Sequence, residues 1–152
     1  MISTDFSMSE AKRVILIDDD HGPMDYFVDA LKMRGFAVQH IDRADDAFDF
    51  IRNPASLAPD IFVIDIMMPY GKYLTAEASN DGMDTGFFVI KECREHFPTI
   101  PIFGLTYRGD RNVLKERLGA VTFMLKHQTS PFDFADTIAA AILQKESQTS
   151  AS

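Results

Sequence analysis

The sequence has 152 residues, of which 46% are hydrophobic and 25% charged, the composition of one globular domain large enough to bury a core. Its formal net charge of −8, with no local cluster of Lys and Arg to offset it, argues against direct binding to nucleic acid or to an anionic membrane surface. The single cysteine, Cys93, excludes an internal disulfide, and the start of the chain does not resemble a signal peptide, so we expect a cytoplasmic protein.

Short apolar runs alternate with amphipathic segments along most of the chain. In chain order the runs are Val14–Ile17, Phe36–His40, Ile61–Ile64, Ile100–Leu105 and Val121–Leu125. Four of the five are almost continuous in apolar residues, which is the pattern of strands buried on both faces. The runs therefore predict a parallel β-sheet.

The segments between these runs carry apolar residues at helical spacing. The three stripes are Met24, Phe27, Val28 and Leu31; Phe87, Ile90, Cys93 and Phe97; and Ala135, Ile138, Ala139 and Ile142. Pro23 and Pro131 suit a first helical turn, Ser130 can cap the last helix, and Gly35 and Gly119 suit helix C-termini. The (βα)5 order with right-handed crossovers predicts a doubly wound α/β fold, a three-layer sandwich.

Both ends of the chain are polar. We expect residues 1–12 to form a flexible N-terminal segment, residues 13–145 to form the domain, and residues 146–152 to form a flexible C-terminal tail. Neither end is long enough to form a second domain.

Groups suited to phosphoryl chemistry follow four of the five runs. They are Asp18, Asp19 and Asp20 after the first, Asp65 after the third, Thr106 after the fourth and Lys126 after the fifth. The second run, expected at the edge of the sheet, ends in nothing comparable. Because sites in such folds form at the carboxyl ends of the strands, near the point where strand order reverses, we expect these side chains to converge.

The predicted convergence has a chemical consequence. Asp18, Asp19 and Asp65 would repel one another unless a cation neutralised them, and Mg²⁺, or Mn²⁺ in its place, is a hard ion that carboxylates and a phosphoryl oxygen bind well. Asp65 is then the candidate nucleophile, while Lys126 would stabilise charge on the transferring group and Thr106 would donate a hydrogen bond to it. Taken singly, each of these residues is more often an ordinary turn or capping residue; their combination in this order favours the functional interpretation.

The segments that carry these residues resemble the receiver domains of two-component response regulators. The resemblance rests on VILIDDD at Val14–Asp20, PDIFVIDIMMP at Pro59–Pro69, IPIFGLT at Ile100–Thr106 and GAVTFMLK at Gly119–Lys126. It extends over about Arg13 to Lys145 and implies a flavodoxin-like sandwich with strand order 2-1-3-4-5.

Carried over residue by residue, the resemblance implies that Asp65 is the phospho-acceptor. Asp19 would bind Mg²⁺ directly, Asp18 would act mostly through water, and the backbone carbonyl of Met67 would complete the protein ligands. Asp20 would support the site without binding the ion.

The resemblance also implies a switch. Movement of Thr106 toward the phosphoryl group would be followed by burial of the aromatic ring of Phe123, although Phe123 is equally well explained as a core aromatic residue. Lys126 is followed by His127, where the family usually has a proline whose cis peptide aims the lysine inward, so we expect Lys126 to be held less firmly.

The sequence departs from the family a second time after its third strand. Residues 70–81 (YGKYLTAEASND) are inserted before Gly82, where the family passes straight into a short turn. The segment carries Tyr70, Tyr73 and Leu74, which could cover the pocket or meet a partner. A mobile surface loop is the simpler expectation.

The resemblance implies a single-domain response regulator that signals through protein contacts, and not an enzyme acting on outside substrates. A sensor histidine kinase or a histidine phosphotransfer protein would supply the phosphoryl group, and the domain would be a monomer or weak homodimer. The alternative is a receiver-like adaptor that works without phosphorylation.

Two other functional classes fit the sequence less well: an aspartyl-phosphate hydrolase and a nucleotide-binding protein. Met67 stands where an aspartyl-phosphate hydrolase would place a second Asp as general acid, and no glycine-rich loop of a nucleotide binder follows the first strand. Met67 and Arg108 lie near the expected approach of hydrolytic water, and Met67 offers it no strong hydrogen bond, so we expect slow self-dephosphorylation.

Overall fold

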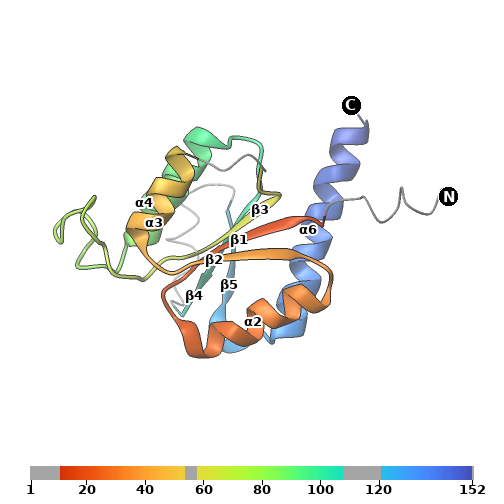
Figure 1. Ribbon diagram of the computed structural model, residues 1–152, viewed down its shortest axis with the longest axis horizontal. Helices are drawn as coiled ribbons and strands as arrows, with labels where there is room; N and C mark the ends of the chain where they lie inside the picture. The colour runs from red at the N-terminus through yellow and green to blue at the C-terminus, as the bar shows by residue number, and fades with distance from the viewer. Residues whose placement is uncertain (1–10, 54–57, 108–120, 152) are drawn as a thin grey trace.

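A computed structural model describes residues 11–53, 58–107 and 121–151, and Figure 1 shows them as a sheet between two pairs of helices. The strands are β1 (Arg13–Ile17), β2 (Ala37–Ile41), β3 (Ile61–Asp65), β4 (Ile102–Thr106) and β5 (Thr122–Leu125). All neighbouring strands are parallel, in the order β2-β1-β3-β4-β5. The predicted doubly wound sheet and its 2-1-3-4-5 order are confirmed.

Within the described residues, four helices and one short 3-10 turn accompany the sheet. They are α2 (His21–Met33), α3 (Ala44–Arg52), α4 (Thr85–His96), η1 (Lys126–Gln128) and α6 (Pro131–Ala151). The helix expected between β4 and β5, with Gly119 at its end, lies outside the described residues. Among the described helices, none combines the length and the apolar character needed to cross a bilayer.

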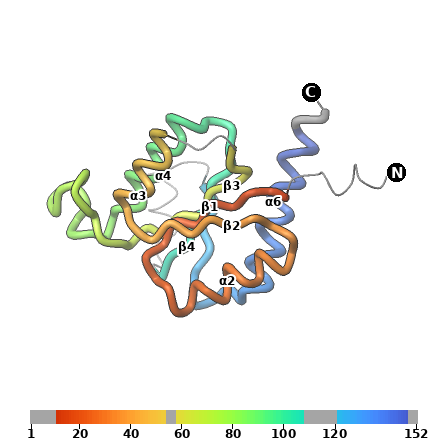
Figure 2. The backbone as a smooth tube through the Cα atoms, viewed as in Figure 1, coloured from red at the N-terminus to blue at the C-terminus, as the bar shows by residue number. Residues whose placement is uncertain are grey.

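Alternation along the central strands divides the core into two halves. In β1, Ile15 and Ile17 pack with buried side chains of α3 and α4, whereas Val14 and Leu16 pack with those of α2 and α6. Figure 2 shows these two helix pairs on opposite sides of the strands. Because β1, β3 and β4 are covered on both sides, they need the near-continuous apolar sequence from which they were predicted.

The helix boundaries follow the local chemistry. Ser130 Oγ accepts a hydrogen bond from the Asp133 amide at 3.1 Å, and Pro131 is the first residue of α6. Gly35 follows α2 with a φ of +91°, a conformation that costs glycine little, and its amide donates to the Lys32 carbonyl at 2.9 Å. Both boundaries were predicted from the sequence.

The last helix extends close to the end of the chain. Residues from 146 onward were predicted to form a flexible tail; α6 continues as a helix to Ala151, and the flexibility of this end stays a prediction. Among the described side chains, Ile142 is the last of this helix in the buried core. Beyond it, Lys12 Nζ lies 3.6 Å from Glu146 Oε2, and Gln144, Lys145 and Glu146 are residues that favour helix.

The inserted segment between β3 and α4 is folded against α3. The Lys72 amide donates to Asp45 Oδ1 at 2.9 Å, and the Tyr73 hydroxyl donates to Asp49 Oδ1 at 2.7 Å. Leu74 packs against the half of the core beneath α3 and α4. Figure 1 shows the segment projecting beyond α3 and α4, beside the sheet edge. The segment therefore contacts α3 and the core, and its expected mobility stays a prediction.

Candidate functional site

Asp65 is the last residue of β3, and it is almost completely buried, with 3% of its surface exposed. All residues of β3 are buried, so the strand fixes the position of this carboxylate at the carboxyl edge of the sheet. Gly86, in the first turn of α4, packs so closely that a methyl group there would overlap the Asp65 carbonyl oxygen. The start of α4 therefore holds the end of β3 in place.

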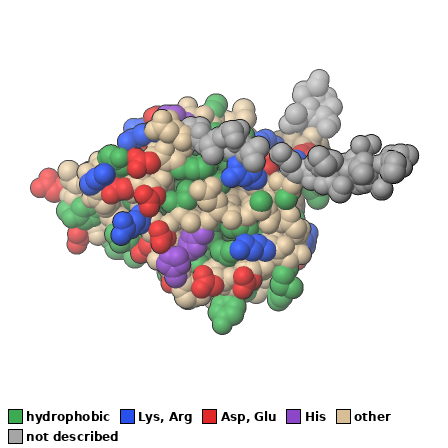
Figure 3. Space-filling model, in the orientation of Figure 1, with side chains coloured by type: hydrophobic (Ala, Val, Ile, Leu, Met, Phe, Trp, Pro, Cys, Tyr) green, Lys and Arg blue, Asp and Glu red, His purple; other side chains and the backbone are tan. Residues whose placement is uncertain are grey.

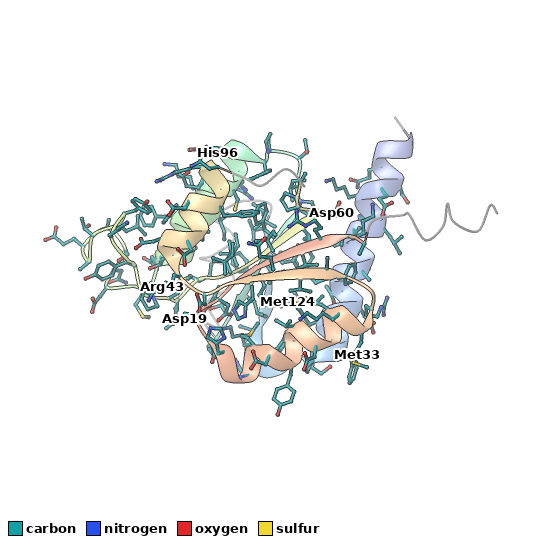
Figure 4. All side chains as sticks on the ribbon, in the orientation of Figure 1. Asp19, Met33, Arg43, Asp60, His96 and Met124 are labelled. Atoms are coloured by element: carbon teal, nitrogen blue, oxygen red, sulfur yellow. The ribbon has the colours of Figure 1, made fainter. Side chains whose placement is uncertain are left out.

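Asp18 and Asp19 follow β1 at the same edge, and Figure 4 shows Asp19 where β1 leads into α2. Asp18 is fully buried and its Oδ1 accepts a hydrogen bond from the Asp20 amide at 2.8 Å, while Asp19 is exposed. One carboxylate oxygen each from Asp18, Asp19 and Asp65 lies within 4.8 Å of the others. The predicted convergence of the three carboxylates is present.

Lys126 joins the two buried carboxylates. Its Nζ lies 2.7 Å from Asp18 Oδ2 and 3.2 Å from Asp65 Oδ2, and only 7% of the residue is exposed. The same Nζ lies 5.0 Å from the centre of the Tyr107 ring, within the range of a cation–π contact. An ammonium that far from water needs these partners, because burial alone disfavours its charge.

The charges in the pocket do not balance. Burial is the main cause that raises the pKa of Asp65, and the neighbouring Asp18 adds to it, so that the pKa rises from 3.8 to about 7 in spite of Lys126. Burial likewise raises the pKa of Asp18, which Lys126 only partly offsets. Burial would lower the pKa of Lys126, but the Asp65 and Asp18 carboxylates together raise it. One ammonium thus faces two buried carboxyl groups and an exposed one.

This excess of carboxylate suits a hard divalent cation. Asp18 Oδ2 is buried and, among the described residues, receives no hydrogen bond of good geometry although Lys126 Nζ is near, which leaves it lone pairs for an ion. Asp19 is exposed and able to bind an ion from the solvent side. The residues present therefore fit Mg²⁺, which needs one or two carboxylates and otherwise keeps its water.

Thr106 and Phe123 lie on the other side of Asp65, on β4 and β5. Thr106 ends β4 fully buried, and Phe123 is buried with 6% of its surface exposed. The Phe123 ring lies where a side chain at Gly104 would have to be, so the missing side chain of Gly104 makes the space for it. The ring belongs to the core half beneath α3 and α4. This placement agrees with the interpretation as a core aromatic residue, and the switch role stays a prediction.

The sequence matches no family model. Among solved structures, it is similar to a response regulator receiver domain protein (CheY-like) from Methanospirillum hungatei JF-1, with a TM-score of 0.71, 19% identity, and 91% of this chain and 99% of that one covered. It is also similar to a response regulator receiver protein from Sinorhizobium medicae WSM419, with a TM-score of 0.67, 21% identity, and 90% and 94% covered. This chain has the fold of a response-regulator receiver domain. A structure from Rhodopirellula baltica, described as an adenylate cyclase, is similar over 93% of this chain and 95% of that one at 25% identity and a TM-score of 0.71.

Lys126 lies in the acidic pocket although no proline follows it. All peptide bonds within the described residues are trans, including the bond between Lys126 and His127. Lys126 begins the 3-10 turn η1, and the His127 ring stacks on Tyr107 at a centroid distance of 6.2 Å. Tyr107 thus contacts both residues. Two carboxylates and an aromatic ring contact Lys126 in this trans arrangement, and the expectation that it is held less firmly than in the family stays a prediction.

Three parts of the site were not found from the sequence. Gly86 and Tyr107 act through close packing between segments far apart in the chain, which no local pattern reveals. The third is His40 on β2, whose Nε2 lies 2.7 Å from the Asp18 carbonyl oxygen. The second strand thus contacts the Asp18 backbone at this edge, although it carries no group that takes part in the proposed phosphoryl chemistry. Arg108, the other residue named for hydrolysis, lies outside the described residues.

Proposed function

We propose that this receiver domain is a Mg²⁺-dependent phospho-acceptor switch, in which Asp65 takes a phosphoryl group from a histidine kinase or a histidine phosphotransfer protein. The observation that supports it most is the convergence of Asp18, Asp19 and Asp65 within 4.8 Å, with Lys126 bridging the buried pair. The reaction would take place in the cytoplasm, and its output would be a change in protein contacts.

The transfer itself makes one bond and breaks one. An Asp65 carboxylate oxygen attacks the phosphorus atom, a P–O bond forms, and the P–N bond to the donor imidazole breaks. Asp65 must be ionised to attack, and its raised pKa means that a nearby positive charge has to keep it so. Bound Mg²⁺ supplies that charge and also neutralises phosphoryl oxygens; Asp18, Asp19, Asp65 and the Met67 carbonyl are the groups that would hold it.

The role of the surrounding residues follows from their positions. Lys126 can exchange its contact with Asp65 Oδ2 for one with a phosphoryl oxygen, which is the same kind of ionic hydrogen bond. Thr106 ends the neighbouring strand, paired in register with Leu125, next to Lys126. A shift of the Thr106 hydroxyl toward the new phosphoryl group would change the surface at the ends of β4 and β5, which we propose is the signalling face.

The test is mass spectrometry of the intact protein after exposure to acetyl phosphate, with and without Mg²⁺. We expect the wild type to gain one phosphoryl group only with Mg²⁺, and Asp65→Asn to gain none. Asp29→Asn is the matched control, because Asp29 is an exposed carboxylate on α2 and should leave labelling unchanged. Labelling that persists in Asp65→Asn would refute the assignment of Asp65 as the phospho-acceptor.

A second experiment tests the alternative of an adaptor that works without phosphorylation. Amide NMR spectra that do not respond to Mg²⁺ with beryllofluoride would favour this adaptor.

A further inference from the structure

A second group of possible metal ligands lies next to the acidic pocket. It consists of His21 at the start of α2, Asp25 one helical turn later, and His40 on β2. One ligand atom from each lies within 4.8 Å of the others. His21 and Asp25 are exposed and His40 is half-buried, so the group is open to solvent. In Figure 3 histidine side chains, in purple, gather on this face beside acidic ones, in red.

Both imidazoles are already oriented by a hydrogen bond at one nitrogen. His21 Nε2 lies 2.7 Å from Asp42 Oδ2, and His40 Nε2 lies 2.7 Å from the backbone carbonyl oxygen of Asp18. A carboxylate and a carbonyl only accept, so each ring in its neutral form donates its Nε2–H and keeps a lone pair on Nδ1. An imidazole that donates one N–H to a carboxylate or carbonyl and offers its other nitrogen is the usual arrangement of a metal-binding histidine.

We propose that His21 Nδ1, His40 Nδ1 and the Asp25 carboxylate bind a first-row transition-metal dication of the Zn²⁺ class. Two imidazoles and one carboxylate are the donors that such ions prefer, whereas Mg²⁺ prefers oxygen alone. Three protein ligands leave a position for water. The site is separate from the proposed Mg²⁺ site and does not depend on phosphorylation.

The position of the site gives it a consequence for the acidic pocket. An ion there would tie the start of α2 to β2, and the turn between β1 and α2 carries Asp18 and Asp19. His40 would bind the ion with one nitrogen and hold the Asp18 carbonyl with the other. The ion would therefore rigidify the segment that presents two of the carboxylates.

The experiment is a titration of the full chain with Zn²⁺ by calorimetry, and with Co²⁺ by visible absorption, both in excess Mg²⁺ to occupy the acidic pocket. We expect one Zn²⁺ per chain, and Nδ1 resonances of two histidines that shift in ¹⁵N spectra of the imidazoles. His40→Ala and Asp25→Asn should each weaken binding at least tenfold. Asp42→Asn, which removes only the partner of His21, should weaken it roughly 10- to 100-fold.

Two controls separate this site from other causes of Zn²⁺ binding. His96→Ala removes a histidine of α4 that contacts the Glu92 carbonyl oxygen, and it should leave the affinity unchanged. Asp65→Asn should also leave it unchanged. Asp25→Asn guards against misfolding, because Asp25 is exposed and its replacement is nearly isosteric. Zn²⁺ affinity that is unchanged in both His40→Ala and Asp25→Asn, or lost in Asp65→Asn, would overturn the proposal, as would no binding by the wild type.

Discussion

At the scale of single residues, Asp65 is buried although the proposed reaction requires its carboxyl group to be charged. Its pKa of about 7, against an ordinary 3.8, means that the folded chain holds a proton that the unfolded chain has released. The folded state is therefore favoured below the lower of these values, and the free energy of unfolding falls as the pH rises through the window between them. The buried Asp65 carboxylate thus destabilises the metal-free fold at neutral and higher pH.

Asp65→Asn should make the metal-free protein more stable at about pH 8, by more than about 1 kcal/mol, because a neutral amide replaces a buried carboxylate. The gain should disappear near pH 3, where Asp65 is mostly protonated in both the folded and the unfolded state. Urea unfolding in the presence of EDTA measures both values. Asp29→Asn, at an exposed position, should change neither. A loss of stability at the higher pH would show that the ion pair with Lys126 outweighs the cost of burying Asp65.

At the scale of elements, α4 and β3 meet through a residue with no side chain. A methyl group at Gly86 would overlap the Asp65 carbonyl oxygen and the Ile66 backbone. Gly86→Ala should therefore lower the free energy of unfolding by about 1–3 kcal/mol, the usual cost of overpacking, and should slow phosphorylation because the end of β3 must shift. Gly22→Ala in α2 is the matched control, since a methyl group there meets nothing within 4 Å.

The docked insertion gives a second prediction at this scale. Tyr73 connects it to α3 by its hydrogen bond to Asp49 and by an edge-on contact with the Phe48 ring at 6.0 Å between centroids. Tyr73→Ala should speed amide hydrogen exchange in the insertion and leave exchange in β1 and β3 unchanged, while stability falls by no more than about 1 kcal/mol. Tyr26→Ala, on the exposed side of α2, is the control. Unchanged exchange in the insertion would mean that other contacts hold it.

The elements also show what sequence patterns can and cannot predict. The strands and the apolar stripes of α2, α4 and α6 were predicted because burial on one or two faces produces a regular spacing of apolar residues in the sequence. The docking of Tyr73 on α3 and the closeness of Gly86 to Asp65 produce no such local pattern, because each depends on segments that are distant in the chain and meet in space. The convergence of Asp18, Asp19, Asp65 and Lys126 was predictable because the strands that carry them end in chemically distinctive residues. His40 was missed because it lies within an edge strand and acts on a backbone carbonyl.

At the scale of the whole molecule, helices cover both faces of the sheet, so the pocket can open only at the carboxyl edge of the strands. The negative excess of the pocket lies there, within a chain whose formal net charge is −8. A divalent cation at this edge would neutralise the carboxylates of Asp18, Asp19 and Asp65, whose mutual repulsion otherwise destabilises the fold. Because it binds the folded state alone, the ion should stabilise the entire domain in one cooperative transition.

Mg²⁺ should therefore raise the melting temperature, and the rise should depend on pH. At about pH 8 the ion binds ionised Asp65, whereas at about pH 5 it must displace a proton from a group whose pKa is about 7, so the rise should be much smaller. Differential scanning calorimetry at the two pH values measures the difference. Asp65→Asn should lose most of the effect, because its amide is a weaker ligand with no charge. A rise that is equal at both pH values would mean that Mg²⁺ stabilises the fold from the protein surface, away from the buried carboxylates on which the proposed chemistry depends.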